Sequence, residues 1–226
     1  MQTLEQRMID TIRRNRISTS EVSDCLGKTG AISGLRSLNA GHHQVGLARF
    51  VYAYNRSNWE FHEQIQDVQS GEILVVEALD CEDYAVFGSL VAKFLFLYRG
   101  VAAVAINGLV RDAHTLRKEN YAIWSTGTTP IGCFNVRNET LPDVHVLRAR
   151  YEGALAVCDD SGVVIIPKAH VTEAFLEKLH LIELQEDAWF HSIDTDGFTT
   201  YETVCMKKYL EEGSVFHKYQ QLKQSL

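Results

Sequence analysis

The spacing of apolar residues changes repeatedly along the chain, from the three- and four-residue spacing of a helix to the alternation or continuous runs of a strand. Runs rich in β-branched and other apolar residues predict strands at residues 46–54, 72–79, 101–106 and 121–127. Apolar residues spaced three and four positions apart, with turn residues at the ends, predict helices at residues 4–16, 18–27, 59–71, 88–100 and 111–120. Helices between successive strands indicate a largely parallel sheet that the helices cover.

The pattern changes after about residue 130. Short strands separated by turn residues are predicted at residues 144–151, 153–160 and 162–167, which indicates a β layer rather than another helical crossover. Pro167 ends this layer, and residues 170–189 begin a helical region. We therefore expect one α/β domain in residues 1–187 and a helical tail in residues 188–226.

Composition and charge narrow the classes of partner. The chain has 226 residues, a formal net charge of −7 and no cluster of basic residues, so we expect no nucleic-acid partner. The longest apolar run, residues 91–98, is too short to cross a bilayer and contains Lys93, so we expect no membrane partner. The N-terminus lacks the apolar core of a secretory signal, and the five cysteines form no CxxC pair. A cytoplasmic location is expected.

An Arg-Asp pair provides the clearest candidate chemistry. Arg111 and Asp112 follow the predicted strand 101–106 and the Asn107-Gly108 pair, which we expect to form a turn. Ligands of open α/β sheets bind where strands end. The residues alone also permit a simpler interpretation, a salt bridge at a helix start with the aspartate favoured by the helix dipole.

Seven stretches, in order, carry a family resemblance. They are ISTSEVSDCLGKTG, LNAGHHQVGLARFV, SGEILVVEAL, FGSLVAK, RGVAAVAINGLVRDAHTLR, STGTTPIG and CDDSGVVIIP. Together they resemble the family of the regulator of RNase E activity A (RraA) and the 4-hydroxy-4-methyl-2-oxoglutarate aldolases. The resemblance covers roughly residues 17–187. It implies a three-layer β/β/α swivelling-domain fold, here with a helical C-terminal extension, assembled as homotrimers or homohexamers with active sites between subunits.

For the enzymes of the family, the resemblance also implies Mg²⁺- or Mn²⁺-dependent retro-aldol cleavage or decarboxylation that releases pyruvate. Arg111 is then the catalytic and substrate-binding cation, and Asp112 the metal ligand. Both roles suit enolate chemistry, because a guanidinium fork and a divalent ion stabilise the negative charge that develops on the keto oxygen. Asp112 is a hard oxygen ligand of the kind that such ions prefer.

A helix start is expected to hold the substrate carboxylate. Gly88 opens the helix, and the backbone N–H groups of Ser89, Leu90 and Val91 would form the anion site. The family turn here is Gly-Glu-Leu-Leu, whose acidic residue is thought to orient a proton-transferring water. This chain has Ser89 instead, and its helix is one residue longer. The nearby Glu82 and Asp83 are candidate substitutes.

Several other polar residues have a structural and a functional interpretation. His62 matches a family histidine, but a buried helix histidine bonded to a carbonyl is the favoured interpretation. Arg117 is expected on the exposed face of its helix, although it could reach a second carboxylate of a substrate. Cys133 and Cys158 are expected to be small core residues. The sequence NRSN at residues 55–58 replaces the Gly-Asp-Asn of the family.

The residues and the resemblance together leave three candidate functions. The first is a divalent-metal-dependent lyase, an aldolase or decarboxylase, that acts on a small-molecule 2-oxo acid through an enolate. The second is a non-catalytic oligomeric regulator of the RraA type. The third is an enzyme that applies the same enolate clamp to another keto acid or a keto sugar. The retained Arg111-Asp112 pair favours the lyase, and the missing acidic residue at position 89 favours the regulator.

Overall fold

A computed structural model describes residues 2–211, 213–214 and 217. The chain divides into two compact units, Met1–Thr172 and Glu173–Leu226. The division expected after residue 187 falls inside helix α7 (Glu173–Asp194). No glycine or proline interrupts this stretch, so the helix runs without a break across the expected boundary. No helix among the described residues is long and apolar enough to cross a membrane.

The first unit contains one mixed sheet of eight strands. The strands are β1 (Arg36–Ser37), β2 (Gln44–Tyr54), β3 (Ile73–Leu79), β4 (Ala85–Phe87), β5 (Ala103–Val110), β6 (Ile123–Thr128), β7 (Leu155–Asp159) and β8 (Gly162–Ile166). Their order is β1-β6-β5-β3-β2-β7-β8, with β4 paired to β5. Strands β2, β3, β5 and β6 pair in parallel, as the alternating pattern predicts, and β7 and β8 add antiparallel pairs.

Both units contain helices. Those of the first unit are α1 (Leu4–Asn15), α2 (Thr19–Cys25), α3 (Trp59–Gln64), α4 (Ser89–Lys93), the π-helix η1 (Phe94–Arg99), α5 (Ala113–Lys118), α6 (His145–Tyr151) and the 3-10 helix η2 (Lys168–His170). The second unit has α7, the π-helix η3 (Tyr201–Cys205) and the 3-10 helix η4 (Lys208–Leu210). In it, Trp189 packs against Tyr209, and Lys208 pairs with Glu202 at 2.5 Å.

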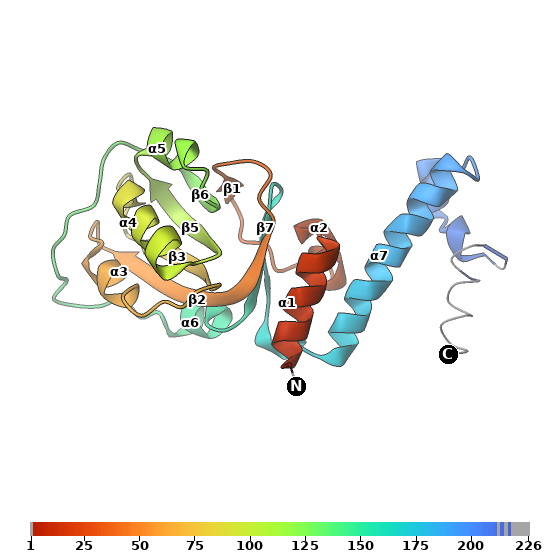
Figure 1. The fold of residues 1–226 in the computed structure, drawn as a ribbon, viewed down its shortest axis with the longest axis horizontal. Helices are drawn as coiled ribbons and strands as arrows, with labels where there is room; N and C mark the ends of the chain where they lie inside the picture. The colour runs from red at the N-terminus through yellow and green to blue at the C-terminus, as the bar shows by residue number, and fades with distance from the viewer. Residues whose placement is uncertain (1, 212, 215–216, 218–226) are drawn as a thin grey trace. The chain divides into compact units, whose positions relative to one another are not determined.

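The sheet has an apolar layer on each face. On one face, the core with α3, α4 and α5 includes Val51, Ala53, Phe61, Leu74, Val76, Ala92, Val104, Ile106 and Leu116. On the other face, the core with α6, β7 and β8 includes Phe50, Tyr52, Ile73, Val75, Ala103, Ala105, Tyr151, Ala156 and Ile165. Figure 1 shows the long, curved β2 running from the neighbourhood of α3 to β7, so that it belongs to both parts of the sheet. The expected α/β class with a C-terminal helix is confirmed.

Two local expectations were wrong. Residues 144–151 were expected to form a strand, but the structure forms α6 there. Val144, Leu147 and Tyr151 share one helical face that packs on the core, and this pattern outweighs the short alternation of Val144 and Val146.

The Asn107-Gly108 pair does not form a turn, since β5 continues to Val110. Asn107 pairs with Glu77 of β3 in the sheet, and its Nδ2 donates to Glu77 Oε2 at 2.7 Å. A Cβ atom at Gly108 would clash with the Cβ of Ala78, so the glycine serves the close approach of two strands.

The helix expected over residues 88–100 changes type along its length. Five α-helical residues of α4 lead into the π-helix η1. A π-helical turn accommodates one residue more than an α-turn. The change of helix type therefore takes up one additional residue after α4 without displacing Gly88 at its start.

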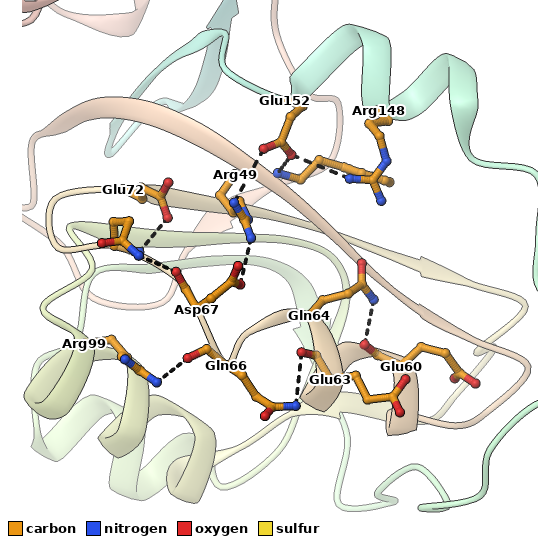
Figure 2. Close-up of polar contacts among 12 residues, drawn as sticks. Arg49, Glu60, Glu63, Gln64, Gln66, Asp67, Glu72, Arg99, Arg148 and Glu152 are labelled. Atoms are coloured by element: carbon orange, nitrogen blue, oxygen red, sulfur yellow. Dashed lines mark hydrogen bonds and ion pairs between the residues drawn. The ribbon is translucent and has the colours of Figure 1, made fainter.

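Polar contacts connect β2 to α3 with the residues that follow it, and to α6 (Figure 2). Arg49 of β2 pairs with Asp67 at 2.8 Å and lies 3.9 Å from Glu152, which follows α6. Glu152 in turn accepts a hydrogen bond from the backbone N–H of Phe50 at 2.9 Å. Gln64 donates to the carbonyl oxygens of Tyr52 and Glu60. These bonds position α3, whose first residues line the candidate site described below.

The start of α2 allows a stability test. Ser18 caps the helix, because its side chain accepts from Glu21 N at 3.2 Å and its N–H donates to Glu21 Oε2 at 2.6 Å. We expect Ser18→Ala to lower the free energy of unfolding by about 1 kcal/mol, as measured by chemical denaturation. Ser20→Ala, at an exposed helical position, is the matched control. An equal loss in both variants would contradict the role of the cap.

Candidate functional site

A pocket of about 190 Å³ lies beside β4, at the end of β5 and at the starts of α3 and α4. Open α/β sheets bind ligands at the carboxyl ends of their parallel strands. The residues that line it are Asn58, His62, Ala85, Val86, Phe87, Gly88, Leu90, Val91, Arg111, Asp112, Cys133 and Asn135. The pocket therefore brings together the Arg-Asp pair and the helix start that the sequence indicated.

Arg111 is held at the end of β5. Its backbone N–H donates to the carbonyl oxygen of Phe87 at 2.9 Å, which joins the ends of β4 and β5. Its guanidinium packs over Gly132, where a Cβ atom would clash with Nη1. About half of the side chain remains exposed (52%). The cation is therefore positioned by backbone contacts and is accessible to a ligand.

Asp112 faces the start of α4. Its backbone is in the left-handed region (φ 60°), which aspartate tolerates, and its side chain does not cap α5. Oδ2 accepts from Ser89 N at 3.0 Å and from Ser89 Oγ at 2.8 Å. These hydrogen bonds, with a smaller contribution from Arg111, hold the pKa of Asp112 below its ordinary value. The carboxylate is therefore ionised at neutral pH.

Gly88 has a steric role beside this pair. A Cβ atom there would lie 2.9 Å from Asp112 Oδ2 and 3.0 Å from Arg111 Cγ. Leu90 and Val91 line the pocket, as expected for a ligand-binding turn, whereas Ser89 does not. The N–H of Ser89 is also occupied by Asp112. The backbone amides left for an anion are those of Leu90 and Val91, which the first turn of a helix leaves unpaired.

His62 is not the buried, carbonyl-bonded histidine that the sequence favoured. Its side chain is exposed at the pocket wall, and within the described part of the chain no hydrogen bond of its ring is found. Partial burial lowers the pKa of the imidazole, so the ring is neutral at physiological pH. The sequence did carry a signal for this residue, namely its match to a family histidine.

The other candidate residues lie outside the pocket. Glu82 is bound by Arg56, whose Nη2 lies 2.6 Å from both carboxylate oxygens. Asp83 and Arg117 are exposed and do not line the pocket. Neither of the two acidic residues named as candidate substitutes, Glu82 and Asp83, lines the pocket.

A pair of thiols forms part of the pocket wall. Cys133 lines the pocket and hydrogen-bonds with the buried Cys81, and this contact together with burial raises the pKa of Cys133. Cys133 is partly buried against the core, and Cys158 is fully buried, in agreement with the expected core role. A protonated thiol is a weak nucleophile, so Cys133 contributes shape rather than reactivity.

A larger, more open hollow of about 440 Å³ lies elsewhere, between α2 and residues 31–35 and 161–164. Its only charged lining residues in the described chain, Asp24 and Lys28, pair with each other at 2.6 Å. The smaller pocket is therefore the candidate site, because of the two it combines an accessible cation with an ionised carboxylate.

The donor set of this pocket suits a hard divalent ion held mostly by water. No group of three or more His, Cys, Asp or Glu side chains among the described residues could hold a metal ion. Asp112 is ionised and partly exposed (38%), and it can offer one oxygen ligand. Mg²⁺ commonly binds through one or two carboxylates, with water and substrate oxygens in its other positions. The residues present thus fit such an ion with Asp112 as the protein ligand.

The fold and the pocket define an α/β protein with an Arg-Asp site at the carboxyl ends of parallel strands. A family model described as RraA-like, Aldolase/RraA, matches residues 19–165. The chain belongs to this family.

Curated relatives and solved structures agree with that assignment. The protein named "Putative 4-hydroxy-4-methyl-2-oxoglutarate aldolase" of Halalkalibacterium halodurans is 27% identical over 228 residues, covering 92% of this chain and 98% of that protein. Protein DlpA of Legionella pneumophila is 25% identical over 82% of this chain, but the match covers only 31% of DlpA. Streptomyces coelicolor RraAS2, described as an unusual member of the RNase ES inhibitor RraA family, shares the fold with a TM-score of 0.66 at 24% identity, over 80% of this chain and 95% of its own.

The contact between Ser89 and Asp112 provides a pH-dependent test. We expect Ser89→Ala to raise the pKa of Asp112 toward about 3.9, its ordinary value, because one of two hydrogen bonds is lost. A lowered folded-state pKa stabilises the protein above the unfolded pKa, and this contribution disappears as the pH falls through the folded value. The stability difference between wild type and variant should therefore shrink below about pH 4. NMR titration of the Asp112 carboxyl measures the shift, and an unchanged pKa would contradict it.

Proposed function

We propose that the protein is a divalent-metal-dependent lyase that releases pyruvate from a 2-oxo acid through an enolate. The observation that carries this proposal is the pocket in which Arg111, Asp112 and the start of α4 lie together. The likeness to a protein named as an aldolase supports the same class. We further propose that the protein acts in the cytoplasm, as its dispersed cysteines led us to expect.

In the proposed reaction, Arg111 binds the substrate's carboxylate and keto oxygen and stabilises the charge of the enolate. The amides of Leu90 and Val91 assist at the carboxylate. Asp112 would hold Mg²⁺ or Mn²⁺, which supplies Lewis-acid polarisation of the keto group when bound. Ser89 keeps Asp112 ionised and oriented by donating to Oδ2. In this scheme Ser89 positions the metal ligand and takes no part in proton transfer.

Proton transfer is assigned to His62. Among the residues that line the pocket, the titratable side chains are His62, Arg111, Asp112 and Cys133. Arg111 stays protonated, Asp112 stays ionised, and the raised pKa of Cys133 keeps its thiol protonated. A neutral imidazole can take the proton of the 4-hydroxyl group and return it to the enolate.

The test is pyruvate release from a panel of 2-oxo acids with and without Mg²⁺. The panel contains oxaloacetate, 4-hydroxy-4-methyl-2-oxoglutarate and 4-hydroxy-2-oxo acids with uncharged tails, and a coupled dehydrogenase reports pyruvate. We expect turnover that requires the metal and stops with a chelator. Absence of pyruvate from every compound would overturn the proposal.

The regulator role remains the second candidate, because the chain lacks an acidic residue at position 89 and shares its fold with a protein described as an RNase ES inhibitor. If the panel gives no pyruvate, an assay of RNase E-type cleavage with added protein tests this role directly. Inhibition at stoichiometric amounts would support it.

We also propose assembly as a homotrimer or homohexamer. Leu90, Leu97 and Tyr98 of the α4–η1 segment are exposed at 79%, 62% and 71%, and a subunit interface would cover this apolar surface. Light scattering at micromolar concentration should give three or six times the 25.5 kDa mass of the chain. A mass of 25.5 kDa would contradict this assembly.

A further inference from the structure

We infer that Asn135 is a further ligand-contacting residue of the pocket, and that Ser57 and Glu60 are positioning residues that hold it there. The inference rests on the proposed function only for the kind of ligand, a 2-oxo acid. Its geometric part depends on contacts within the chain. Three observations support it: the loop that carries Asn135, the direction of its side chain, and two buried polar residues that fix the loop.

Asn135 lies in a long loop. Residues 129–144, between β6 and α6, form no helix or strand, and Figure 1 shows them in green as an extended connection. Loops of this length inside a compact domain usually have a function. Much of the apolar surface of this loop is exposed, so apolar burial within one chain fixes little of its path. The exposed apolar residues are Ile131, Phe134, Val136 and Leu141.

The backbone next to Asn135 runs beside the segment that precedes α3. Phe134 forms an isolated parallel bridge with Ser57. Its N–H donates to the carbonyl oxygen of Arg56 at 2.8 Å, and its carbonyl oxygen accepts from the N–H of Asn58 at 3.1 Å. Both backbone groups of the preceding residue are therefore paired, and this pairing holds the chain extended where it reaches Asn135.

The extended backbone directs Asn135 toward the pocket, because successive side chains of such a segment point to opposite sides. Phe134 and Val136 are exposed on one side, whereas Cys133 and Asn135 line the pocket on the other. The Asn135 side chain is exposed, and among the described residues no hydrogen bond of its amide is found. An amide offers two donors and an acceptor oxygen. Asn135 can therefore bond an oxygen of an acid held at Arg111.

Two buried polar side chains fix the loop just beyond Asn135. The hydroxyl of Ser57 donates to the carbonyl oxygen of Val136 at 2.6 Å and accepts from its N–H at 3.2 Å. Glu60 accepts from the backbone N–H of Asn138 and from its Nδ2, both at 2.9 Å. A buried carboxylate is costly unless donors satisfy it. The loop conformation that brings Asn138 to Glu60 is therefore favoured over others.

Amide hydrogen exchange, followed by NMR without ligand, tests the positioning role. We expect exchange at least about tenfold faster at Val136 in Ser57→Ala and at Asn138 in Glu60→Gln, because a protecting hydrogen bond is lost or faces an NH₂ group. The amides of β3 and β5 should exchange as in wild type. Glu63→Gln is the matched control, since it removes the same charge from an exposed position of α3. Unchanged exchange at both loop amides, or an equal increase in the core, would overturn this role.

Calorimetry tests the ligand contact. The assembled protein is titrated with Mg²⁺ alone and then, with Mg²⁺ present, with pyruvate and with 2-oxoglutarate, which has no 4-hydroxyl group for retro-aldol cleavage. We expect Asn135→Ala to keep its Mg²⁺ affinity and to bind the tighter of the two acids about three- to tenfold more weakly, the range for one lost hydrogen bond. Light scattering verifies that the variant assembles as wild type does. Unchanged affinity for both acids, no binding of either by wild type, or a loss of Mg²⁺ affinity would overturn the contact.

A double-mutant cycle joins the two roles. If Glu60 acts through Asn135, Glu60→Gln weakens acid binding about threefold or more in wild type and has no further effect in Asn135→Ala. Glu63→Gln should bind as wild type does. An equal loss in both backgrounds would show that Glu60 supports the fold only, and would overturn the inference.

These measurements are independent of turnover and so separate the inference from the proposed function. A coupled cycle without pyruvate release from any 2-oxo acid would uphold the inference and refute the lyase. Pyruvate release by wild type, with binding and turnover unchanged in Asn135→Ala, would uphold the lyase and refute the role of Asn135.

Discussion

Asp112→Asn is expected to lower metal-dependent pyruvate release by about 10²–10³-fold, because the carboxylate is the proposed metal ligand and Lewis-acid stabilisation contributes several kcal/mol. Asparagine is the suitable replacement, since it tolerates the left-handed backbone (φ 60°) that Asp112 adopts. It can also still accept the two hydrogen bonds from Ser89. The measurement is turnover against Mg²⁺ concentration, together with Mg²⁺ or Mn²⁺ binding by calorimetry.

Asp83→Asn provides the control for this substitution. Asp83 is an exposed acidic residue outside the pocket, so its variant loses the same charge without touching the site. We expect wild-type metal dependence there. Undiminished metal binding and turnover in Asp112→Asn would remove Asp112 from the metal site, and the proposal for this ion would then fail.

Arg111→Lys is expected to lower turnover by about 10²–10³-fold even though the charge is retained, as for loss of a group that stabilises the developing oxyanion. A lysine ammonium cannot bond the carboxylate and the keto oxygen with a planar fork. Gly132→Ala tests the same cation without changing it, because the added Cβ would displace the guanidinium that packs there. Both variants should lose turnover while their thermal unfolding stays close to wild type.

Arg117→Lys is the matched control for Arg111→Lys, because Arg117 is exposed on α5 and lies outside the pocket lining. Its variant should behave as wild type. Full activity of Arg111→Lys would show that the protein needs only a positive charge at this place. The binding geometry proposed for the enolate would then be wrong.

Much of the site could be predicted because its parts are short and local. Gly88 is a local helix-start signal, and Arg111 and Asp112 come soon after an expected strand. The strand β4 before Gly88 was not expected, and β5 runs to Val110 rather than ending at residue 106. The sequence favoured no site role for the polar lining residues at the start of α3. Asn58 and His62 stand on a separate element, and only the packing of α3 against β2 brings them to the pocket that Arg111 lines.

The periods of the apolar residues determined the α/β class, the parallel strands and the helices between them, because these periods depend only on which face of each element is buried. The tertiary structure decided the rest. Asn107-Gly108 became part of β5 because β3 lies alongside it, and residues 144–151 became a helix because the core accepts their helical face. It also decided that Ser89 binds Asp112 and that His62 faces a pocket rather than the core. Contacts between residues distant in the chain leave no periodic trace in the sequence.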